Sequence, residues 1–403
     1  MAIDNKDKKV LKSSIEREQN EVACSAECEK IKGSKNLNVP PLRFPEFSGE
    51  WEKRTLEDVS EFSKERMNTQ NLSSDNYVAT ENMLHDYQGI IEASSVPTNT
   101  NVIKFNKGDV LLSNIRPYLK KVWFADKNGG CSADVFVFKA LSACIPDFLH
   151  YIIANDRFIN FAMSGAKGVK MPRGDKEQMK TYEIGLPSIE EQKKIAKLLS
   201  LLDERITTQN KIIEDLKKLK SAIRKRVFTS LKNEHTESCE INQLLAYEQP
   251  TAYIVANNEY STDTTLTPVL TANKGFVLGY TDEDSGIYQK GECIIFDDFT
   301  MDAKYVSFPF KVKSSAIKIL TAKPNVNLRF MFEYLSFLGL KSEEHKRHYI
   351  SEIASLVIEL PSKEKQNIIA NLMTSLDNKL ALKEKAEARY EAKKRYLLSQ
   401  MFI

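Results

Sequence analysis

The stretch LPSIEEQKKIAKLLSLLDERI, which begins at Leu186, is followed 174 positions later by LPSKEKQNIIANLMTSLDNKL, which begins at Leu360. The match continues without a gap to Phe228 in the first copy and to Phe402 in the second. Similarity at one fixed shift over so many residues indicates an internal repeat. The pairs that it brings into register include Gln192 with Gln366, Leu202 with Leu376, and Asp203 with Asp377.

A second match shows that the repeat extends upstream of these stretches. FNKGDVLL at residues 105–112 matches YQKGECII at residues 288–295, at a shift of 183. The larger shift indicates that connecting loops differ in length between the copies, which surface loops tolerate. At 403 residues the chain is also more than twice as long as a typical domain, which predicts two core-forming units.

The composition is that of a folded protein. Hydrophobic residues make up 42% of the chain, and 58 Lys and Arg nearly balance 55 Asp and Glu. The sequence shows neither a signal-peptide pattern nor an apolar run of about 20 residues, the length that a membrane span needs. We therefore expect a soluble protein of the cytoplasm.

Each copy begins with a region of mixed pattern. Runs of β-branched and aromatic residues predict strands at 135–138 and 317–320, and glycine-containing segments predict turns at 128–130 and 284–286. Helical patterns follow at 145–162 and 328–340. The expected class of each region is α+β.

A helix start signal closes each mixed region. Pro187 and Pro361 cannot continue a strand ladder, and the serine that follows each of them is a good N-cap. Glu191 completes a capping box with Ser188, whereas Lys365, the equivalent residue of the second copy, cannot.

Beyond each start, apolar residues recur at alternating spacings of four and three, as in the a and d positions of a coiled coil. Gln209 and Lys220 break the first seam, and Lys383, Glu387 and Lys394 break the second. We expect two helices of about 60 Å that pair antiparallel, place Gln209 near Lys383 in one central layer, and hold the mixed regions apart. The seam residues are Ile195, Leu199, Leu202, Ile206, Ile213, Leu216, Ile223, Ile369, Met373, Leu376, Leu380, Tyr390 and Leu397.

The resulting organisation has five parts. They are a charged tail at 1–38, a first mixed domain at 39–186, a first helix at 187–230, a second mixed domain at 231–360, and a second helix at 361–403. The tail is disordered, forms a partner-binding helix, or results from an early start codon.

Basic residues gather in the two helices and in a few loops. The helices carry 20 Lys and Arg against 11 Asp and Glu, which either solubilise their outer faces or lie along a phosphate backbone. The loops at 114–121, 164–173, 297–305 and 311–315 combine cations with amide, hydroxyl, aromatic or glycine residues, which suits contacts with bases and phosphates. Each alone could be an ordinary solvated loop, but Lys121 and Lys304 occupy the same place in both copies. The candidate nucleic-acid contacts are Asn114, Arg116, Tyr118, Lys120, Lys121, Lys167, Lys170, Arg173, Lys274, Thr300, Lys304, Tyr305, Lys311, Lys313 and Ser314.

No catalytic or metal-binding pattern stands out. The sequence has no phosphate-binding loop, zinc-protease motif or nucleophile elbow. Cys24 and Cys28 lack two further ligands for zinc. Asp297 or Asp298 with Asp302 and Lys304 resembles a nuclease site only superficially, because the repeat partner has no acids. We expect no catalytic residue and no metal.

The combined landmarks resemble the specificity subunit of type I restriction-modification systems. The resemblance rests on two mixed domains, each followed by LPS-x-x-E-Q or LPS-x-E-K-Q and a long amphipathic helix. The opening PLRFPEF at residues 41–47, with Gly49 and Trp51, also looks like the usual start of that family. These landmarks cover about residues 40–403.

The resemblance implies a non-catalytic protein of phage defence that binds double-stranded DNA. Each mixed domain would be a target recognition domain for one half of a split sequence, and the helix pair would set the gap between the halves. The chain would bind no cofactor itself. It would assemble with two adenine-methyltransferase subunits, which bring S-adenosylmethionine, and with translocase-endonuclease subunits, which use ATP and Mg.

Two features depart from the family pattern. Residues 1–38 precede the usual start, and the second mixed domain is acidic, with 12 Lys and Arg against 18 Asp and Glu. The competing interpretation is a non-catalytic, two-headed protein-interaction scaffold in which DNA plays no part. The missing motifs oppose a nuclease or a methyltransferase.

Overall fold

The structure, a computed structural model, describes residues 38–231, 236–272, 275–340 and 348–403. The predicted tail lies outside these residues except for Asn38. The chain divides into two compact units, here called domain 1 (residues up to Arg205 with Tyr390–Ile403) and domain 2 (Ile206–Arg389). These units differ from the two repeats, because the end of each long helix belongs to the domain of the other repeat.

Domain 1 contains two four-stranded sheets. The first has the order β2-β9-β6-β7, formed by β2 (Ser60–Phe62), β9 (Val135–Ala140), β6 (Val110–Ser113) and β7 (Val122–Phe124). The second has the order β3-β5-β8-β4, formed by β3 (Arg66–Asn68), β5 (Asn101–Phe105), β8 (Gly129–Cys131) and β4 (Tyr77–Val78). The remaining elements are β1 (Glu52–Thr55), which pairs with β10 (Glu183–Leu186), and the helices α2 (Leu56–Val59), α3 (Pro146–Ile153), α4 (Asp156–Ser164) and α5 (Lys176–Lys180).

Alternation along the central strands explains why the first sheet is covered on both faces. Leu112 and Phe138 belong to the core shared with α3 and α4, whereas Leu111 and Val137 belong to a core shared with the second sheet. Because successive side chains of a strand point to opposite faces, a strand buried on both faces is a continuous apolar run, as 135–138 is.

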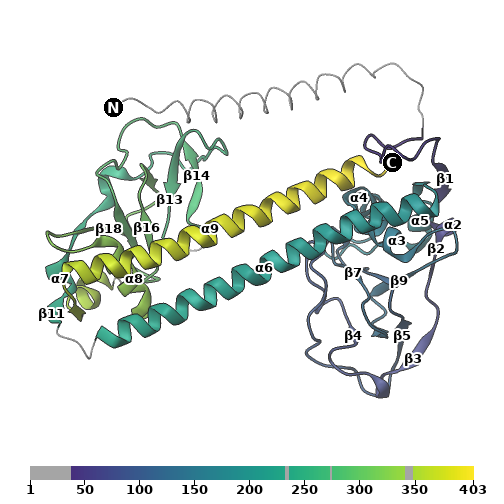
Figure 1. The fold of residues 1–403 in the computed structure, drawn as a ribbon, viewed down its shortest axis with the longest axis horizontal. Coiled ribbons are helices and arrows are strands. Elements are labelled where there is room, and N and C mark those ends of the chain that lie inside the picture. Colours follow the sequence, from purple (N-terminus) through teal and green to yellow (C-terminus); the bar gives the residue numbers. More distant parts are fainter. Residues whose placement is uncertain (1–37, 232–235, 273–274, 341–347) are drawn as a thin grey trace. The chain divides into compact units, whose positions relative to one another are not determined.

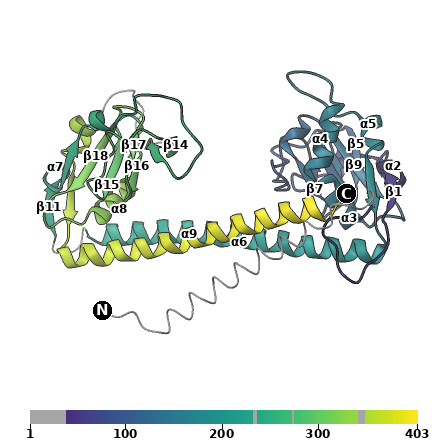
Figure 2. The same cartoon turned by 90° about the horizontal axis from the view of Figure 1, so that it is seen from above.

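Domain 2 repeats the first sheet. Its order is β12-β18-β15-β16, formed by β12 (Leu245–Glu248), β18 (Ile317–Ala322), β15 (Cys293–Asp297) and β16 (Ala303–Val306); β15, β16 and β18 are labelled in Figure 2. The register is also repeated, since Leu111 opposite Val137 corresponds to Ile294 opposite Leu320 at the shift of 183. The other elements are β11 (Glu237–Glu240), which pairs with β19 (Val357–Leu360), the three-stranded sheet β14 (Val277–Thr281), β13 (Thr267–Leu270) and β17 (Lys311–Val312), and the helices α7 (Ile241–Leu244) and α8 (Leu328–Leu338). The α+β class and the duplication are confirmed.

Two local predictions in domain 1 are wrong. Gly129 and Gly130, predicted as a turn, lie in strand β8, where a Cβ on Gly129 would be 2.1 Å from the carbonyl oxygen of Asn76. These glycines therefore permit close backbone approach, which is their other common role. The helix predicted over 145–162 is interrupted, because Asn155 accepts a hydrogen bond from the Arg157 amide and caps a new helix, α4.

The long helices are α6 (Ile189–Leu231) and α9 (Lys363–Gln400), where 187–230 and 361–403 were predicted. All thirteen seam residues are buried or half-buried. Ser188 accepts a hydrogen bond from the Glu191 amide at 3.4 Å, but the Glu191 carboxylate does not complete the capping box. It binds both Nε and a terminal nitrogen of Arg43 at 2.7 Å and is 1% exposed. Arg43 thereby fastens the PLRFPEF segment to the start of α6.

In each domain a segment of α6 lies beside an antiparallel segment of α9 (Figures 1 and 2). In domain 2, Gln209 Nε2 donates to the Lys383 carbonyl oxygen at 3.2 Å, which places the two polar breaks in one layer as predicted. Lys220 Nζ lies 2.6 Å from an Asp377 oxygen there. In domain 1, Lys394 Nζ lies 2.5 Å from Asp203. These ion pairs are repeat-related, since Lys394 follows Lys220, and Asp377 follows Asp203, by 174 positions.

A buried glutamine joins each long helix to its domain. Gln192 is fully buried and donates to the carbonyl oxygens of Pro187 (2.9 Å) and Ala143 (3.0 Å), while it accepts from the Ile145 amide (2.9 Å) just before α3. Gln366 makes the equivalent bonds with Pro361 (2.9 Å) and the Asn327 amide (2.8 Å) before α8. The last residue of each repeated L-P-S-x-x-x-Q motif is thus structural.

We expect Gln192→Ala to lower the free energy of unfolding of domain 1 by about 3 kcal/mol, because it leaves a buried amide and two carbonyl groups without partners. Urea denaturation followed by circular dichroism checks this. Asn210→Ala, at an exposed position of α6, is the control and should change the free energy of unfolding by no more than about 0.5 kcal/mol. Equal effects would contradict the structural role.

We expect Asp203→Ala and Lys394→Ala to be coupled by about 1 kcal/mol in a double-mutant cycle, because both groups lie within the helix seam. The coupling should fall as salt rises. The exposed pair Lys193 and Glu190 on α6 is the control cycle, with an expected coupling below about 0.5 kcal/mol. A coupling near zero for Asp203 and Lys394 would show that the repeated ion pair does not stabilise the seam.

Candidate nucleic-acid interface

The structure brings the two basic loops predicted in domain 1 together. The Arg116 amide donates to the Pro172 carbonyl oxygen (2.8 Å), the Gly174 amide donates to that of Asn114 (3.2 Å), and Ile115 forms a β-bridge with Arg173. Residues 114–121, which connect β6 to β7, and residues 165–174, which follow α4, therefore form one surface, here called the loop pair.

Backbone strain concentrates at the loop pair. Arg116 and Lys120, at the two ends of a short 3-10 helix (Pro117–Leu119), both have φ of 52°. Asp86 and Tyr87 also have positive φ, and their amides donate to the carbonyl oxygens of Leu119 and Lys120. Four of the seven non-glycine residues with positive φ in the described part of the chain thus lie in one cluster. Left-handed backbone is costly for residues with a Cβ, and such strain gathers at functional sites.

Three of the six cations of the loop pair are held by carboxylates. Lys120 lies 2.8 Å from Asp156, Lys167 lies 2.7 Å from Asp175, and Arg173 lies 3.3 Å from Asp134. Burial by itself would raise the pKa of Asp156, but hydrogen bonds from Lys120 and Tyr87 bring that pKa below its usual value. Because such exposed ion pairs contribute little stability, a phosphate can replace the carboxylate at small cost.

Other predicted contacts in domain 1 differ in their availability. Lys170 and Tyr118 are exposed. Lys121 donates to the Thr80 carbonyl oxygen at 2.6 Å, and burial lowers its pKa, so it holds the loop in place. Asn114 Oδ1 and Arg116 Nε are buried and have no hydrogen-bond partner within the described residues. Unsatisfied polar atoms of this kind are expected where a ligand supplies the missing partner.

Domain 2 presents fewer predicted contacts. Thr300 at the β15–β16 turn and Lys313 and Ser314 in the following loop are exposed. Lys304 on β16 is half-buried, as is Tyr305, whose ring lies 5.0 Å from the guanidinium of Arg329. Lys274 lies outside the described residues.

Lys311 does not fit its predicted role. Its side chain is 3% exposed, and its Nζ lies 2.7 Å from Glu283 and donates to the Ser285 carbonyl oxygen at 2.6 Å. The alternation of cations in 311–313 gave no sign of this, because Glu283 is 28 positions away.

Asp297 and Asp298 of domain 2 accept hydrogen bonds from backbone amides. Asp297 accepts from the amides of Phe299 and Thr300, both at 2.9 Å. Asp298 accepts from those of His348 (3.1 Å) and Tyr349 (2.8 Å). The superficial nuclease pattern therefore serves to shape loops. Across the described residues there is no cluster of three or more His, Cys, Asp or Glu that could hold a metal, and no helix is long and apolar enough to cross a membrane.

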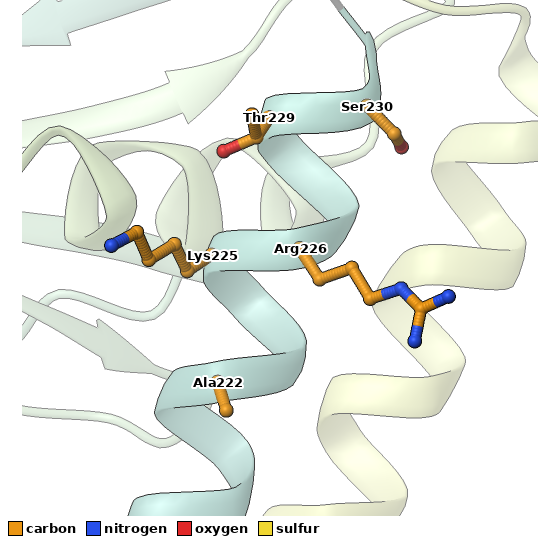
Figure 3. A pocket seen from close by; sticks show the side chains of 5 residues that line it. All are labelled: Ala222, Lys225, Arg226, Thr229 and Ser230. Atoms are coloured by element: carbon orange, nitrogen blue, oxygen red, sulfur yellow. The ribbon is translucent and has the colours of Figure 1, made fainter.

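A shallow hollow of about 470 Å³ lies over α6 in domain 2 (Figure 3). All five residues that line it come from this one helix, and all are exposed. Lys225 and Arg226 point to opposite sides of the helix in Figure 3. The hollow is an open helix surface with no paired acid and base. Its lining residues are Ala222, Lys225, Arg226, Thr229 and Ser230.

Sequence reasoning missed the apolar residues of the loop pair. Val169 and Met171 lie between the predicted cations and have relative exposures of 104% and 50%. In the sequence, exposed apolar residues are indicated only by the alternation of Val169, Lys170 and Met171 between Gly168 and Pro172.

We expect Arg116→Gly to be more stable to urea than Arg116→Ala by about 1 kcal/mol, because glycine adopts the left-handed backbone of this position without strain. Both variants should bind DNA equally weakly, since both lack the guanidinium. Equal stability of the two variants would show that Arg116 is unstrained, and DNA affinity equal to that of the unsubstituted chain would remove Arg116 from the interface.

Comparisons with known proteins give a family match over most of the chain. Residues 48–218 and 233–391 each match the family described as the type I restriction modification DNA specificity domain. The chain is 44% identical over 127 residues to the specificity subunit of an Escherichia coli type I restriction enzyme, a match that covers 30% of this chain and 31% of that relative. It is 34% identical over 160 residues to a type I specificity subunit from Methanocaldococcus jannaschii, which covers 40% of this chain and 36% of the relative. These matches span about a third of the length of each relative.

One solved structure shows the same fold. The S subunit of a type I restriction-modification system from M. genitalium has a TM-score of 0.64 to this chain, with 91% of this chain and 99% of that chain covered at 17% identity.

Proposed function

The chain belongs to the family of type I restriction-modification DNA specificity domains, and on that premise we propose that it selects a split DNA sequence, with one half-site bound by each domain. In this proposal the loop pair of domain 1 binds the first half-site. The β15–β16 turn of domain 2, with the loop that contains Lys313 and Ser314, binds the second.

The observation that carries the proposal is the loop pair itself. It combines exposed cations held by exchangeable carboxylates, two strained cationic residues, and buried polar atoms of Asn114 and Arg116 without partners. Phosphates would replace the carboxylates beside the exposed cations. The equivalent hairpin of domain 2 shares its place on the repeated sheet, which supports one half-site for each repeat.

The acidic character of domain 2 is compatible with this role. Several of its carboxylates are turned to internal partners, as Glu283 is to Lys311 and Glu333 is to Arg224 and Arg329. The charge that DNA meets is therefore set by local groups such as Lys304 and Lys313, and not by the net count of the domain.

The partner subunits and their cofactors are proposed from the chain's membership of this family. We propose that the chain is the non-catalytic subunit of a cytoplasmic complex, in which two methyltransferase subunits supply S-adenosylmethionine chemistry and translocase-endonuclease subunits use ATP and Mg. The paired helices would set the gap between the half-sites. The competing scaffold would need no DNA, and the strained, cationic loop pair is the feature that it leaves unexplained.

We expect that cells expressing the chain with its cognate methyltransferase acquire N6-methyladenine in a split sequence with a fixed gap, as read by single-molecule sequencing of genomic DNA. Cells with the methyltransferase alone are the control. Identical methylation in both would overturn the proposal and favour the scaffold.

A further inference from the structure

The tip of the loop at 165–174 exposes apolar side chains that nothing in domain 1 covers. Val169 is 104% exposed, so its side chain makes no packing contact, and the neighbouring Met171 is half exposed. Isolated apolar residues are common on protein surfaces. Here, however, two of them occupy the tip of a loop that also carries three cations, Lys167, Lys170 and Arg173.

The stem below this tip is rigid. The Lys167 amide donates to the Arg173 carbonyl oxygen and the Arg173 amide donates back to that of Lys167, both at 2.9 Å. The Arg116 amide binds the Pro172 carbonyl oxygen from the other loop. Gly168, at φ of 98°, makes the turn that these bonds close. A preformed tip loses little conformational entropy when it binds, which favours a role in recognition.

The charges around the tip define its ligand. Lys167 and Arg173 at the stem are 82% and 58% exposed, and Lys170 is exposed between Val169 and Met171. A complementary surface has anionic edges with small apolar groups between them. The major groove of DNA has this arrangement, because phosphates line its edges and the 5-methyl groups of thymine project into it, whereas the minor groove presents no methyl group.

From this geometry we propose that the loop tip enters the major groove of the half-site bound by domain 1, and that Val169 reads a thymine by contact with its methyl group. Met171 packs beside it, and Lys167, Lys170 and Arg173 bind the flanking phosphates. This inference rests on the proposed function and adds to it the residue and the base atom that determine specificity.

The test removes only the methyl group. The chain, assembled with its methyltransferase subunits, is titrated with DNA that carries the split target, and each thymine of the first half-site is replaced in turn by deoxyuridine. We expect one replacement to weaken binding about fourfold, the effect of uncovering one methyl group. Val169→Ser, which removes both γ-methyl groups, should bind the thymine and deoxyuridine duplexes equally. Because Val169 touches nothing, this variant should fold normally.

Two variants complete the design. Val357→Ser changes a valine that is 62% exposed on β19 of domain 2, and should keep the full preference for thymine. Lys170→Gln should weaken binding to every duplex alike and reduce its salt dependence by about one phosphate contact.

The results distinguish a failure of the methyl contact from a failure of the proposed function. Indifference of the unsubstituted complex to every deoxyuridine, or an undiminished thymine preference in Val169→Ser, would overturn the methyl contact while the proposed function stands. Failure of the complex to select any split DNA sequence would overturn the proposed function, and the methyl contact with it.

Discussion

A buried side-chain amide governs how each long helix meets its domain. Gln192 and Gln366 are almost completely buried, and each binds the proline carbonyl oxygen before its own helix and the backbone amide just before a neighbouring helix. Amides and carbonyls at helix ends have no partner within the helix, so a buried end requires one from elsewhere. One residue type meets this need in both repeats. It anchors the start of α6 within domain 1 and the start of α9 within domain 2.

The features that could be predicted from the sequence are those with a local period or an internal copy. Alternating spacings of three and four predicted both helix seams. The shift of 174 predicted that Asp203 and Asp377 occupy equivalent positions in the two repeats. What could not be predicted depends on distant partners. Glu191 appeared to be a capping residue but binds Arg43, 148 positions away, and Gly129 appeared to be a turn residue but lies against Asn76. The candidate interface follows the same division. Its loops could be proposed from local composition, whereas the burial of Lys311 beside Glu283 depends on a distant residue and was not foreseen.

The loop pair shows how a chain with a net charge of only +3 can present a surface suited to DNA. Three of its cations, Lys120, Lys167 and Arg173, are paired with Asp156, Asp175 and Asp134. If this surface binds DNA as proposed, the ligand must displace these three carboxylates in a fixed geometry. The strained backbone at Arg116 and Lys120 supplies that geometry before the ligand arrives.

The division of the chain has a consequence for its synthesis. The core of domain 1 contains Leu397, Leu398, Met401 and Phe402, and the ring of Phe402 stacks on that of Phe148 at 5.2 Å. The ribosome must therefore complete all of domain 2, residues 206–389, before domain 1 can close. At about 5–20 residues per second this interval lasts on the order of ten to forty seconds. Throughout it the nascent first domain lacks the apolar side chains of residues 397–402 that complete its core.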